Sequence, residues 1–497
     1  MIVNLHEYSH QRGIEREALR ILKSGQIATS DHPIALGSKL TNSNITVDFS
    51  EGLIELITEP FDSINQTLTR LKKILAFSTQ HIEQNELLLC TSMPLNTTEA
   101  EIRVANFGCS NSGKMKEVYR RGLAKRYGKI MQAISGIHYN FSYDTHLISK
   151  LAQKNQMTKD ELYFSVINNY FELMWLIPYL FGASPICAKS SVKQKPDYLE
   201  TFDENFYIAE YATSLRMSNL GYQSPAQKPL FISYKGLQEY VHDLINATKT
   251  SYPSFDAFGL YNDKGLRHQL NNSILQIENE YYSNIRPKET AKRGERPALA
   301  LLNRGVTYLE IRVLDVNPFS PLGIDNDTAY FIEALLMTCL MITKKEYSPN
   351  DVARNKLNFS HVVTQGRKPK LKLINNKNKL ESLKSFGLEK LERITDVAKT
   401  MGEPYYQAVT RQIEKFHDPD KTLSGQFTNY IQGNYYNNVL NLSKFNTEHL
   451  QKIKLSAKDQ TEFIQKAKNS LAAQEALENN NYCELNTYID HYYLSAD

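Results

Sequence analysis

Apolar and polar side chains alternate along several stretches of this chain, which is the pattern of a β-strand with one buried face. Two clear examples are residues 135–142 and 306–316. In the first, Ile137, Tyr139 and Phe141 occupy alternate positions. Alternate residues of a strand share a face, so these three form an apolar side. The sequence therefore predicts a sheet with one apolar and one polar face.

The polar face of these strands carries mainly carboxylates and basic side chains. The paired positions on it are Glu15 with Glu17, His138 with Asn140, and Glu310 with Arg312. Residues 45–59, which include Asp48 and Glu55, supply further strand with the same chemistry. Oxygen ligands suit Mg²⁺, which usually keeps several waters and shares its coordination shell with substrate phosphates. The sequence therefore predicts a sheet that holds hard cations.

Helical spacing of apolar residues predicts helices around these strands. The expected helices are 64–84, 116–132, 160–182, 236–246 and 325–343. From about residue 346 the composition shifts to Lys, Asn, Gln and Glu, with helical periodicity and few strand signals. We therefore expect an α+β protein in which residues 1–345 carry the chemistry and residues 346–497 form a helical extension packed on them.

The remaining segments of the first region give weaker signals. We expect a short helical lead-in at 1–12, a hairpin at 13–28 with its turn at 23–26, a buried strand at 87–94, and an alternating stretch at 275–282 that runs on to 285–288. Pro318 and Pro321 end the last strand, because proline lacks the backbone donor that a ladder needs.

Composition and charge narrow the class of protein. The chain has 497 residues, of which 41% are hydrophobic and 23% charged, as in ordinary globular proteins. Its net charge of +4 is small and the charges are interspersed, which argues against a nucleic-acid partner. The five cysteines are scattered without a CxxC motif, which fits a reducing, cytoplasmic location. The longest apolar run, 173–181, contains Pro178 and is too short to span a bilayer, so no membrane partner is expected.

Two local patterns have competing interpretations. Residues 107–114 nearly match a phosphate-binding P-loop, but Met115 stands where Ser or Thr should hold the metal, and no convincing strand precedes them. A Gly/Ser/Asn loop that closes over a ligand is favoured instead. Asp48 and Glu51 have the spacing of a helix N-cap signature, and this local role is preferred for Glu51.

A series of motifs runs in order along the first 345 residues. They are Gly-Ile-Glu-Arg-Glu (13–17), Asp-Phe-Ser-Glu (48–51) with Glu55, Tyr-Arg-Arg-Gly-Leu (119–123), Ser-Gly-Ile-His-Tyr-Asn-Phe-Ser (135–142), Pro-Tyr-Leu-Phe-Gly-Ala-Ser-Pro (178–185), Ala-Thr-Ser-Leu-Arg-Met-Ser-Asn-Leu-Gly-Tyr (212–222), Gln-Ile-Glu-Asn-Glu (276–280), Ile-Arg-Pro-Lys (285–288) and Asn-Pro-Phe-Ser-Pro (317–321). Each motif alone is modest, but the ordered series is hard to obtain by chance. With these motifs the chain resembles glutamate–cysteine ligase of the proteobacterial type, and the match continues more weakly beyond residue 345.

The resemblance implies a curled six-stranded antiparallel sheet, like that of glutamine synthetase, surrounded by helices. It also implies ATP, Mg²⁺, L-glutamate and L-cysteine as ligands, with Mn²⁺ as an alternative ion. A monomer is expected, although the sequence does not give the oligomeric state. The reaction would transfer the ATP γ-phosphoryl group to the glutamate side-chain carboxylate. The cysteine amine would then displace phosphate to give γ-glutamylcysteine, the first step of glutathione biosynthesis.

The family's functional residues carry over by matched position. The implied metal ligands are Glu15, Glu17, Asp48, Glu55, His138 and Glu310, and the implied catalytic cations are Arg312 and Arg120. Arg216 matches the contact to the substrate carboxylate, and the cysteine pocket matches Phe49, Tyr119, Leu123, Gln132, Tyr222 and Tyr282. Arg286 and Lys288 are expected to face the nucleotide.

Simpler interpretations stand beside these roles. Glu15 and Glu17 could be a solvated edge, His138 a structural histidine, and most of the 30 tyrosines packing residues. Glu278 and Glu280 are expected to balance nearby arginines rather than bind metal. The competing functions are a γ-glutamyl ligase for another amine, a bifunctional glutathione synthetase, for which no second ATP-binding module follows residue 345, and a non-catalytic homologue.

Overall fold

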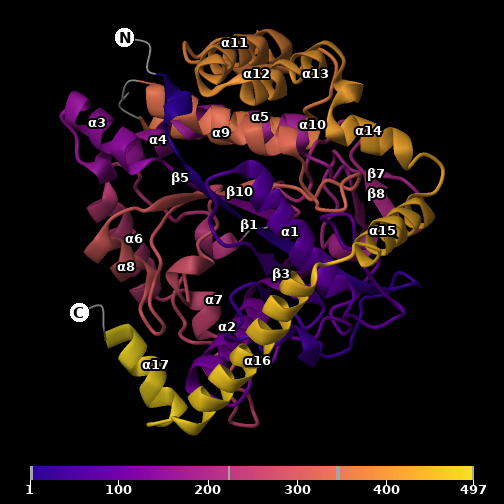
Figure 1. Ribbon diagram of the computed structural model, residues 1–497, viewed down its shortest axis with the longest axis vertical. Coiled ribbons are helices and arrows are strands. Elements are labelled where there is room, and N and C mark those ends of the chain that lie inside the picture. The colour runs from indigo at the N-terminus through magenta and orange to yellow at the C-terminus, as the bar shows by residue number, and fades with distance from the viewer. Residues whose placement is uncertain (1–3, 222–223, 343–347, 495–497) are drawn as a thin grey trace.

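An antiparallel sheet crosses the computed structural model in the strand order β2–β3–β1–β5–β10–β9. Its strands β3, β1, β5 and β10 are labelled in Figure 1. Its strands are β1 Gln11–Leu22, β2 Ile45–Val47, β3 Leu53–Ile57, β5 Ile137–Ser142, β9 Ile285–Lys288 and β10 Tyr308–Leu314. A seventh strand, β4 Glu86–Leu88, pairs with the far end of β1. The structure describes residues 4–221, 224–342 and 348–494. The predicted α+β class and large antiparallel sheet are confirmed.

The alternation in the sequence decides which face of the sheet is buried. Ile137, Tyr139 and Phe141 on β5 are fully buried, as are Leu309 and Ile311 on β10. They join one hydrophobic core with the helices behind the sheet. Burying such side chains contributes roughly 1.5–3 kcal/mol each, so the strands hold their polar sides on the opposite face.

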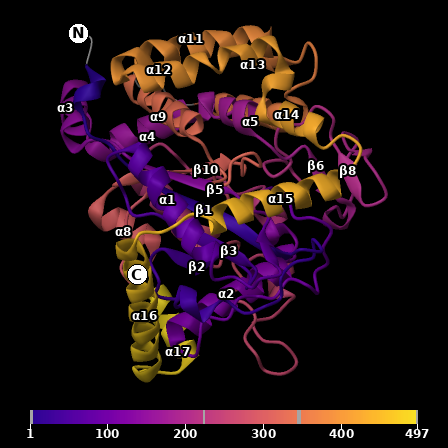
Figure 2. The same cartoon turned by 45° about the vertical axis from the view of Figure 1, so that its right-hand side comes forward.

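Helices cover the apolar face in two layers. The inner layer contains α1 Ile64–Thr79, α4 Lys159–Leu173, α5 Leu176–Phe181 and α9 Asn326–Met341. The outer layer contains α11 Leu383–Met401, α12 Glu403–Thr410 and α13 Ile413–His417, which lie above α9 and α5 in Figures 1 and 2. Thus part of the chain after residue 346 closes the core of the first region.

The last helices run down the side of the sheet. They are α14 Leu423–Tyr430, α15 Tyr435–Gln451, α16 Ala457–Asn479 and α17 Leu485–Leu494. The helix α15 packs on α1 and β4, and α16 packs on α1 and the short helix η2 Ile34–Leu36. Finally, α17 lies against α2 Asn111–Tyr127, as both cartoon views show (Figures 1 and 2).

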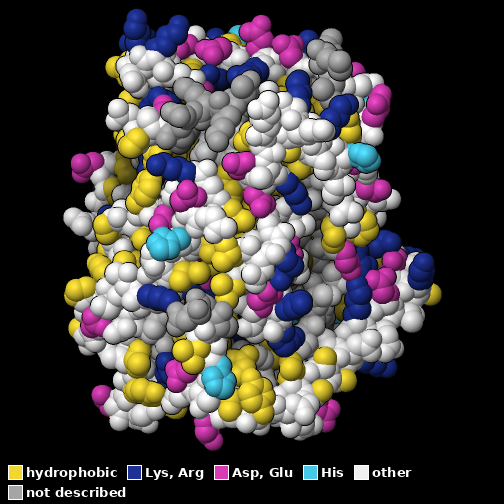
Figure 3. Space-filling model, turned by 90° about the vertical axis from the view of Figure 1, so that its left-hand side faces the viewer, with side chains coloured by type: hydrophobic (Ala, Val, Ile, Leu, Met, Phe, Trp, Pro, Cys, Tyr) yellow, Lys and Arg dark blue, Asp and Glu magenta, His cyan; other side chains and the backbone are white. Residues whose placement is uncertain are grey.

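The remaining elements are short or peripheral. They are the helices α3 Thr145–Asn155, α6 Leu237–Lys249, α7 Pro253–Asp256, α8 Pro297–Arg304 and α10 Pro349–Gln365, the strands β6 Ile186–Ala188, β7 Glu200–Thr201 and β8 Phe206–Ile208, which form one small sheet, and the strands β11 Lys372–Ile374 and β12 Leu380–Ser382, which form another. None of the helices in the described ranges is long and apolar enough to cross a membrane. On the face drawn in Figure 3, basic and acidic side chains are interspersed.

Several sequence-based boundaries differ from the structure. The helix expected at 160–182 is divided between α4 and α5, because Pro178 has no backbone donor and clashes with the carbonyl one turn earlier. The helix expected at 116–132 begins at Asn111 and ends before Gly128, whose φ of 92° leaves the helical region. The expected strand 45–59 is two strands, β2 and β3.

Four further expectations are wrong in part. The lead-in at 1–12 is a single turn, η1 Leu5–Glu7, and β1 already begins at Gln11. The hairpin at 13–28 returns only through the bridge Ile21–Ile27. Of the strand expected at 87–94, only Leu87 and Leu88 are in a strand, as part of β4 Glu86–Leu88. In the alternating stretch 275–282, Glu278–Glu280 is a 3-10 turn, and the carboxylates of Glu278 and Glu280 are buried and bind arginine side chains.

Candidate active site

The register of the sheet brings acidic and basic residues from five strands onto one face. Glu17 on β1 lies opposite Glu55 on β3, and Glu15 on β1 lies opposite His138 on β5. On the other side of β5, Asn140 lies opposite Glu310 of β10, which in turn faces Arg286 of β9. Residues separated by almost 300 positions therefore become neighbours through strand pairing.

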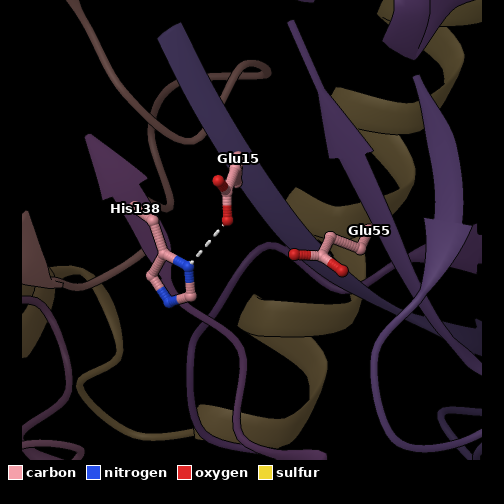
Figure 4. A group of neighbouring side chains, drawn as sticks. All are labelled: Glu15, Glu55 and His138. Atoms are coloured by element: carbon pink, nitrogen blue, oxygen red, sulfur yellow. Dashed lines mark hydrogen bonds and ion pairs between the residues drawn. The ribbon is translucent and has the colours of Figure 1, made fainter. Parts of the chain in front are cut away.

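His138 lies at the centre of the carboxylates. Its Nδ1 is 3.2 Å from Glu15 Oε2 and 3.6 Å from Glu310 Oε1, and its Nε2 is 3.7 Å from Glu17 Oε1. Figure 4 shows Glu15 and Glu55 on neighbouring strands with the imidazole beside them. Possible ligand atoms of Glu15, Glu55 and His138 all lie within 4.8 Å of one another. One ion could therefore reach all three side chains.

Burial and mutual repulsion perturb these carboxylates. Burial, followed by the charges of Glu15, Asp48 and Glu17, raises the pKa of Glu55 well above its usual value. Burial also raises the pKa of Glu17, although His138 opposes this. Carboxylates that repel one another beside an imidazole are suited to bind a divalent cation. The residues present fit a Mg²⁺ or Mn²⁺ ion.

Basic side chains surround Glu310 at the other end of the row. Arg312 Nη1 lies 2.9 Å from Glu310 Oε1, whereas Lys288 Nζ and Arg286 Nη1 lie 3.7 and 3.8 Å from Glu310 Oε2. Burial acts to raise the pKa of Glu310, but Lys288, Arg312 and Arg286 outweigh it and hold the pKa well below its usual value. A register irregularity of β10 between Ile311 and Leu314 adds one residue beside Arg312, a feature that can re-aim side chains near active sites.

Arg120 and Asp48 approach the acidic row from α2 and from the end of β2. Arg120 Nε donates to the backbone carbonyl of Asp48, and the Arg120 guanidinium lies 4.4 Å from the centre of the Phe107 ring. Asp48 is close enough for its charge to raise the pKa of Glu55. Lys116, one turn before Arg120, is a cation that the sequence analysis missed. Its Nζ lies 5.3 Å from the centre of the Phe107 ring, which the Arg120 guanidinium also contacts.

Arg216 lies beneath the loop that leads into β5. It is 2% exposed, and its Nη1 donates to the carbonyl of Arg312 at 3.1 Å. Asp315 Oδ1 lies 4.0 Å from Arg216 Nη1. A Cβ on Gly136 would come within 2.0 Å of Arg216 Nη2, so only glycine admits the guanidinium at this point. The Ser-Gly-Ile-His motif therefore positions both Arg216 and His138.

The predicted acceptor pocket is partly assembled. Phe49 and Leu123 belong to one buried cluster, and Tyr119 packs against it. Gln132 Nε2 donates to Tyr282 Oη at 3.4 Å. Tyr222 lies outside the described residues. Three of these side chains, Tyr119, Leu123 and Tyr282, come from α2 and the segment before β9, so the pocket depends on how those two parts of the chain pack.

Three acidic residues have structural partners. Glu278 binds Arg296 and Glu280 binds Arg126, at 2.7 and 3.2 Å. The expectation that these two balance arginines is confirmed. The N-cap role of Glu51 is wrong, because no helix begins at Asp48 and Glu51 instead binds Lys39 Nζ at 2.7 Å. The near match to a P-loop also fails, since only the single bridge residue Val104, and no strand, precedes the loop that leads into α2.

Backbone and amide donors complete the site. Asn140 Nδ2 donates to Glu15 Oε1 at 2.8 Å, and the N–H of Gly136 donates to Glu17 Oε2 at 2.6 Å. The alternation in the sequence placed Asn140 beside His138 but did not assign it a role. The Gly136 contact requires the chain to turn from η3 Met131–Ala133 into β5, which local pattern does not reveal.

Comparisons with known proteins agree over nearly the whole chain. Residues 5–362 match the family model described as glutamate-cysteine ligase. The chain is 41% identical to a protein named glutamate–cysteine ligase from Pseudomonas paraeruginosa and 38% identical to one from Saccharophagus degradans, in each case over 97% of this chain and 94% of the relative.

Solved structures give the same picture. A crystal structure of glutamate–cysteine ligase from Francisella tularensis in complex with AMP is 51% identical, covers 98% of both chains and superposes with a TM-score of 0.97. A bifunctional glutathione synthetase from Pasteurella multocida is 24% identical, with a TM-score of 0.72 over 90% of this chain and 53% of that one. The second similarity concerns the fold alone.

Proposed function

The chain belongs to the glutamate–cysteine ligase family, and from this premise we propose that the charged face of its sheet joins the γ-carboxylate of L-glutamate to the amine of L-cysteine at the expense of ATP. One observation carries the proposal. The sheet places a row of carboxylates and His138 beside Arg312, Arg286 and Lys288. An anion-rich substrate pair needs this combination of metal ligands and cations.

The reaction requires charge neutralisation more than covalent catalysis. A carboxylate is a poor electrophile until it is phosphorylated, and phosphoryl transfer depends on positioning and electrostatic stabilisation. Mg²⁺ or Mn²⁺ held by Glu15, Glu17, Asp48, Glu55, His138 and Glu310 would supply that neutralisation when bound. Attack of the cysteine amine on γ-glutamyl phosphate then forms the amide bond, breaks the carbon–oxygen bond to the phosphate and releases it.

The basic residues have distinct parts in this proposal. Arg312, fixed by Glu310 at 2.9 Å, would hold the moving phosphoryl group, with Arg120 as a second cation. Arg216 would bind the substrate carboxylate, since its guanidinium lies against the Arg312 backbone on the same side of the sheet. Arg286 and Lys288 would face the nucleotide. The AMP complex of the Francisella relative supports a nucleotide ligand for this fold.

The acceptor pocket would admit a small thiol side chain. Phe49 and Leu123 supply apolar walls, with Tyr119 against them. Gln132 and Tyr282 hydrogen-bond each other and close the polar side, and Tyr222 would complete the pocket. A larger or charged amine side chain would have to displace these buried groups, which favours cysteine over other amines.

The test is ADP release from Mg-ATP and glutamate, with and without an amine. Cysteine and 2-aminobutyrate are compared with unrelated amines, and Glu15→Gln and Arg312→Ala are measured beside the wild type. We expect release to require glutamate plus cysteine or 2-aminobutyrate, and to fall at least about 100-fold in both variants. Glu414→Gln and Arg411→Ala repeat the same two changes on exposed residues far along the chain and should retain activity.

Other outcomes point to the rival functions. If ADP release responds to another amine but not to cysteine, the assigned catalytic face is retained and the acceptor substrate is a different amine. Absence of release with every amine would support a non-catalytic homologue, and equal activity of wild type and Glu15→Gln would reject the assigned face.

We further propose that residues 1–345 are the catalytic region and 346–497 a helical extension, because every assigned site residue precedes residue 313. One chain contributes all of these residues, which supports a monomer. The cytoplasm supplies ATP and reduced cysteine, which supports that location. Sedimentation of the full chain at assay concentration tests the monomer, and fractionation of cells tests the location.

A further inference from the structure

The last helix of the chain packs on the element that carries the predicted acceptor residues. Ile489 of α17 is fully buried against Val118 of α2 and Leu270. Tyr119 and Tyr493 pack against the same small cluster. The contact joins the C-terminal extension to the helix that also carries Arg120 and Leu123 (Figure 2).

Tyr493 makes two directed hydrogen bonds at this contact. Its hydroxyl donates to the carbonyl of Gln276 at 2.6 Å and accepts from Asn271 Nδ2 at 2.9 Å. Its ring also lies near Arg296, whose guanidinium carbon is 5.7 Å from the ring centre. The ring and the hydroxyl thus have separate partners. Removal of the hydroxyl alone would leave the packing in place.

Gln276 connects the Tyr493 contact to α2 through its side-chain amide. Its side chain is fully buried, its Nε2 donates to the carbonyl of Tyr119 at 3.1 Å, and its Oε1 accepts from the N–H of Leu270 at 3.0 Å. A Cβ on Gly122 would lie 2.1 Å from Gln276 Oε1, so α2 has a glycine where this amide crosses it. A buried amide that is hydrogen-bonded through both its oxygen and its nitrogen fixes the spacing of the groups that it joins.

The same residue connects to Tyr282. The N–H of Gln276 donates to Glu280 Oε2 at 2.6 Å, and Glu280 is held by Arg126 of α2 at 3.2 Å. Gln227 then bridges Glu280 and Tyr282: its Nε2 donates to the Glu280 carbonyl, and its Oε1 accepts from the Tyr282 N–H, both at 3.0 Å.

We propose that α17, through Tyr493 and Gln276, is a positioning element for the acceptor-amine pocket and sets the separation of Tyr119 from Tyr282. Neither residue touches substrate, so both act through the pocket walls. The inference rests on the proposed function, because it assumes that these two tyrosines bind the acceptor. The C-terminal extension would thus contribute to acceptor recognition, although it is far in sequence from the residues assigned to the site.

The experiment uses the full chain with Tyr493→Phe, and with Gln276→Met as a second variant of similar volume. Tyr482→Phe makes the same chemical change on a tyrosine that is 75% exposed just before α17 and serves as the matched control. The steady-state KM for cysteine, glutamate and ATP and the kcat are measured for each. Hydrogen exchange of residues 111–127 and 270–282 is followed in parallel, without substrates.

Loss of the two hydrogen bonds of the Tyr493 hydroxyl should raise the KM for cysteine about two- to tenfold in Tyr493→Phe. The KM for cysteine should rise more in Gln276→Met, and the KM for ATP and for glutamate should stay within about twofold of wild type in both variants. Exchange should rise in both peptides. The Tyr482→Phe variant should match wild type in every readout.

Equal exchange in Tyr493→Phe and wild type, or an unchanged KM for cysteine in an enzyme that requires cysteine, would overturn the positioning role. A uniform change of all three KM values would also overturn it, because that result indicates a general loss of structure. A wild type without cysteine-dependent ADP release would reject the proposed function instead, while the exchange measurement would still decide whether α17 orders the two walls.

Discussion

At the scale of the residue, two glutamates, one within β3 and one just after it, have opposite surroundings. Burial and neighbouring carboxylates raise the pKa of Glu55. Burial also acts to raise the pKa of Glu59, but hydrogen bonds from Arg70 and Lys466 outweigh it and lower the pKa to about 2. A raised pKa in the folded state means that the ionised group destabilises the fold at neutral pH, and a lowered pKa means the reverse.

Glu55→Gln should therefore change stability and activity in opposite directions. Without divalent metal at pH 7.5, the melting temperature should rise, because one repelling charge is removed. The Mg²⁺ concentration for half-maximal ADP release should also rise, by at least about tenfold, because a ligand is lost. Glu59→Gln is the control and should lower the melting temperature while it leaves the Mg²⁺ requirement unchanged. A lower melting temperature for Glu55→Gln would contradict the assigned repulsion.

At the scale of the element, one buried carboxylate ties the sheet to the helices behind it. Glu333 of α9 is fully buried and accepts two hydrogen bonds from Arg12 of β1, at 2.7 and 2.9 Å. The hydroxyls of Tyr139 on β5 and Tyr405 on α12 donate to it at 2.6 and 2.8 Å. Two strands of the active face and two helix layers therefore share a single anion.

Glu333→Gln should destabilise the protein strongly. The amide cannot neutralise the buried Arg12, and leaving one charge of a buried pair unpaired costs about 3–5 kcal/mol. Urea unfolding of the purified variant measures the loss. The Glu414→Gln variant makes the same substitution in the exposed pair with Lys421 and should unfold like wild type, because surface pairs contribute little. Similar midpoints for the two variants would show that the network is not required for stability.

At the scale of the whole molecule, two buried histidines make the fold sensitive to acid. Burial lowers the pKa of His10 to about 4, although Glu333 opposes this, and lowers that of His32 to about 3, with Lys39 and Arg20 adding to the effect. An unfolded histidine titrates near 6.5. Below pH 6.5 the unfolded chain therefore binds protons at these two histidines, whereas the folded chain does not. The free energy of unfolding falls as the pH drops below 6.5.

We expect the free energy of unfolding to decrease steadily between pH 7 and pH 4.5, by on the order of a few kcal/mol for the two histidines together. His32→Leu should flatten this dependence, because both ring nitrogens of His32 are buried without a hydrogen-bond partner among the described residues. Urea titrations at several pH values test the slope. His417→Leu, at an exposed position, should keep the wild-type slope, and an unchanged slope in His32→Leu would reject the assignment.

The sequence by itself determined which side chains share a face. The period of two in a strand is a local property of the backbone, so the alternation around His138 and Glu310 was sufficient to separate core from polar face. Proline and glycine positions likewise indicated element ends, although the division at Pro178 and the 3-10 turn at Glu278–Glu280 were missed. Matched motifs supplied the family and the implied roles.

Only the tertiary structure decided which faces meet. The pairing of Glu15 with His138, and of Glu310 with Arg286, depends on strand order and register. Those are set by burial over the whole core rather than by neighbours in sequence. The contact of Tyr493 with Gln276 has a separation of 217 residues, and no local pattern encodes it. Local backbone geometry thus placed the charged side chains on one face of each strand, whereas long-range packing brought the strands together so that these faces form one site.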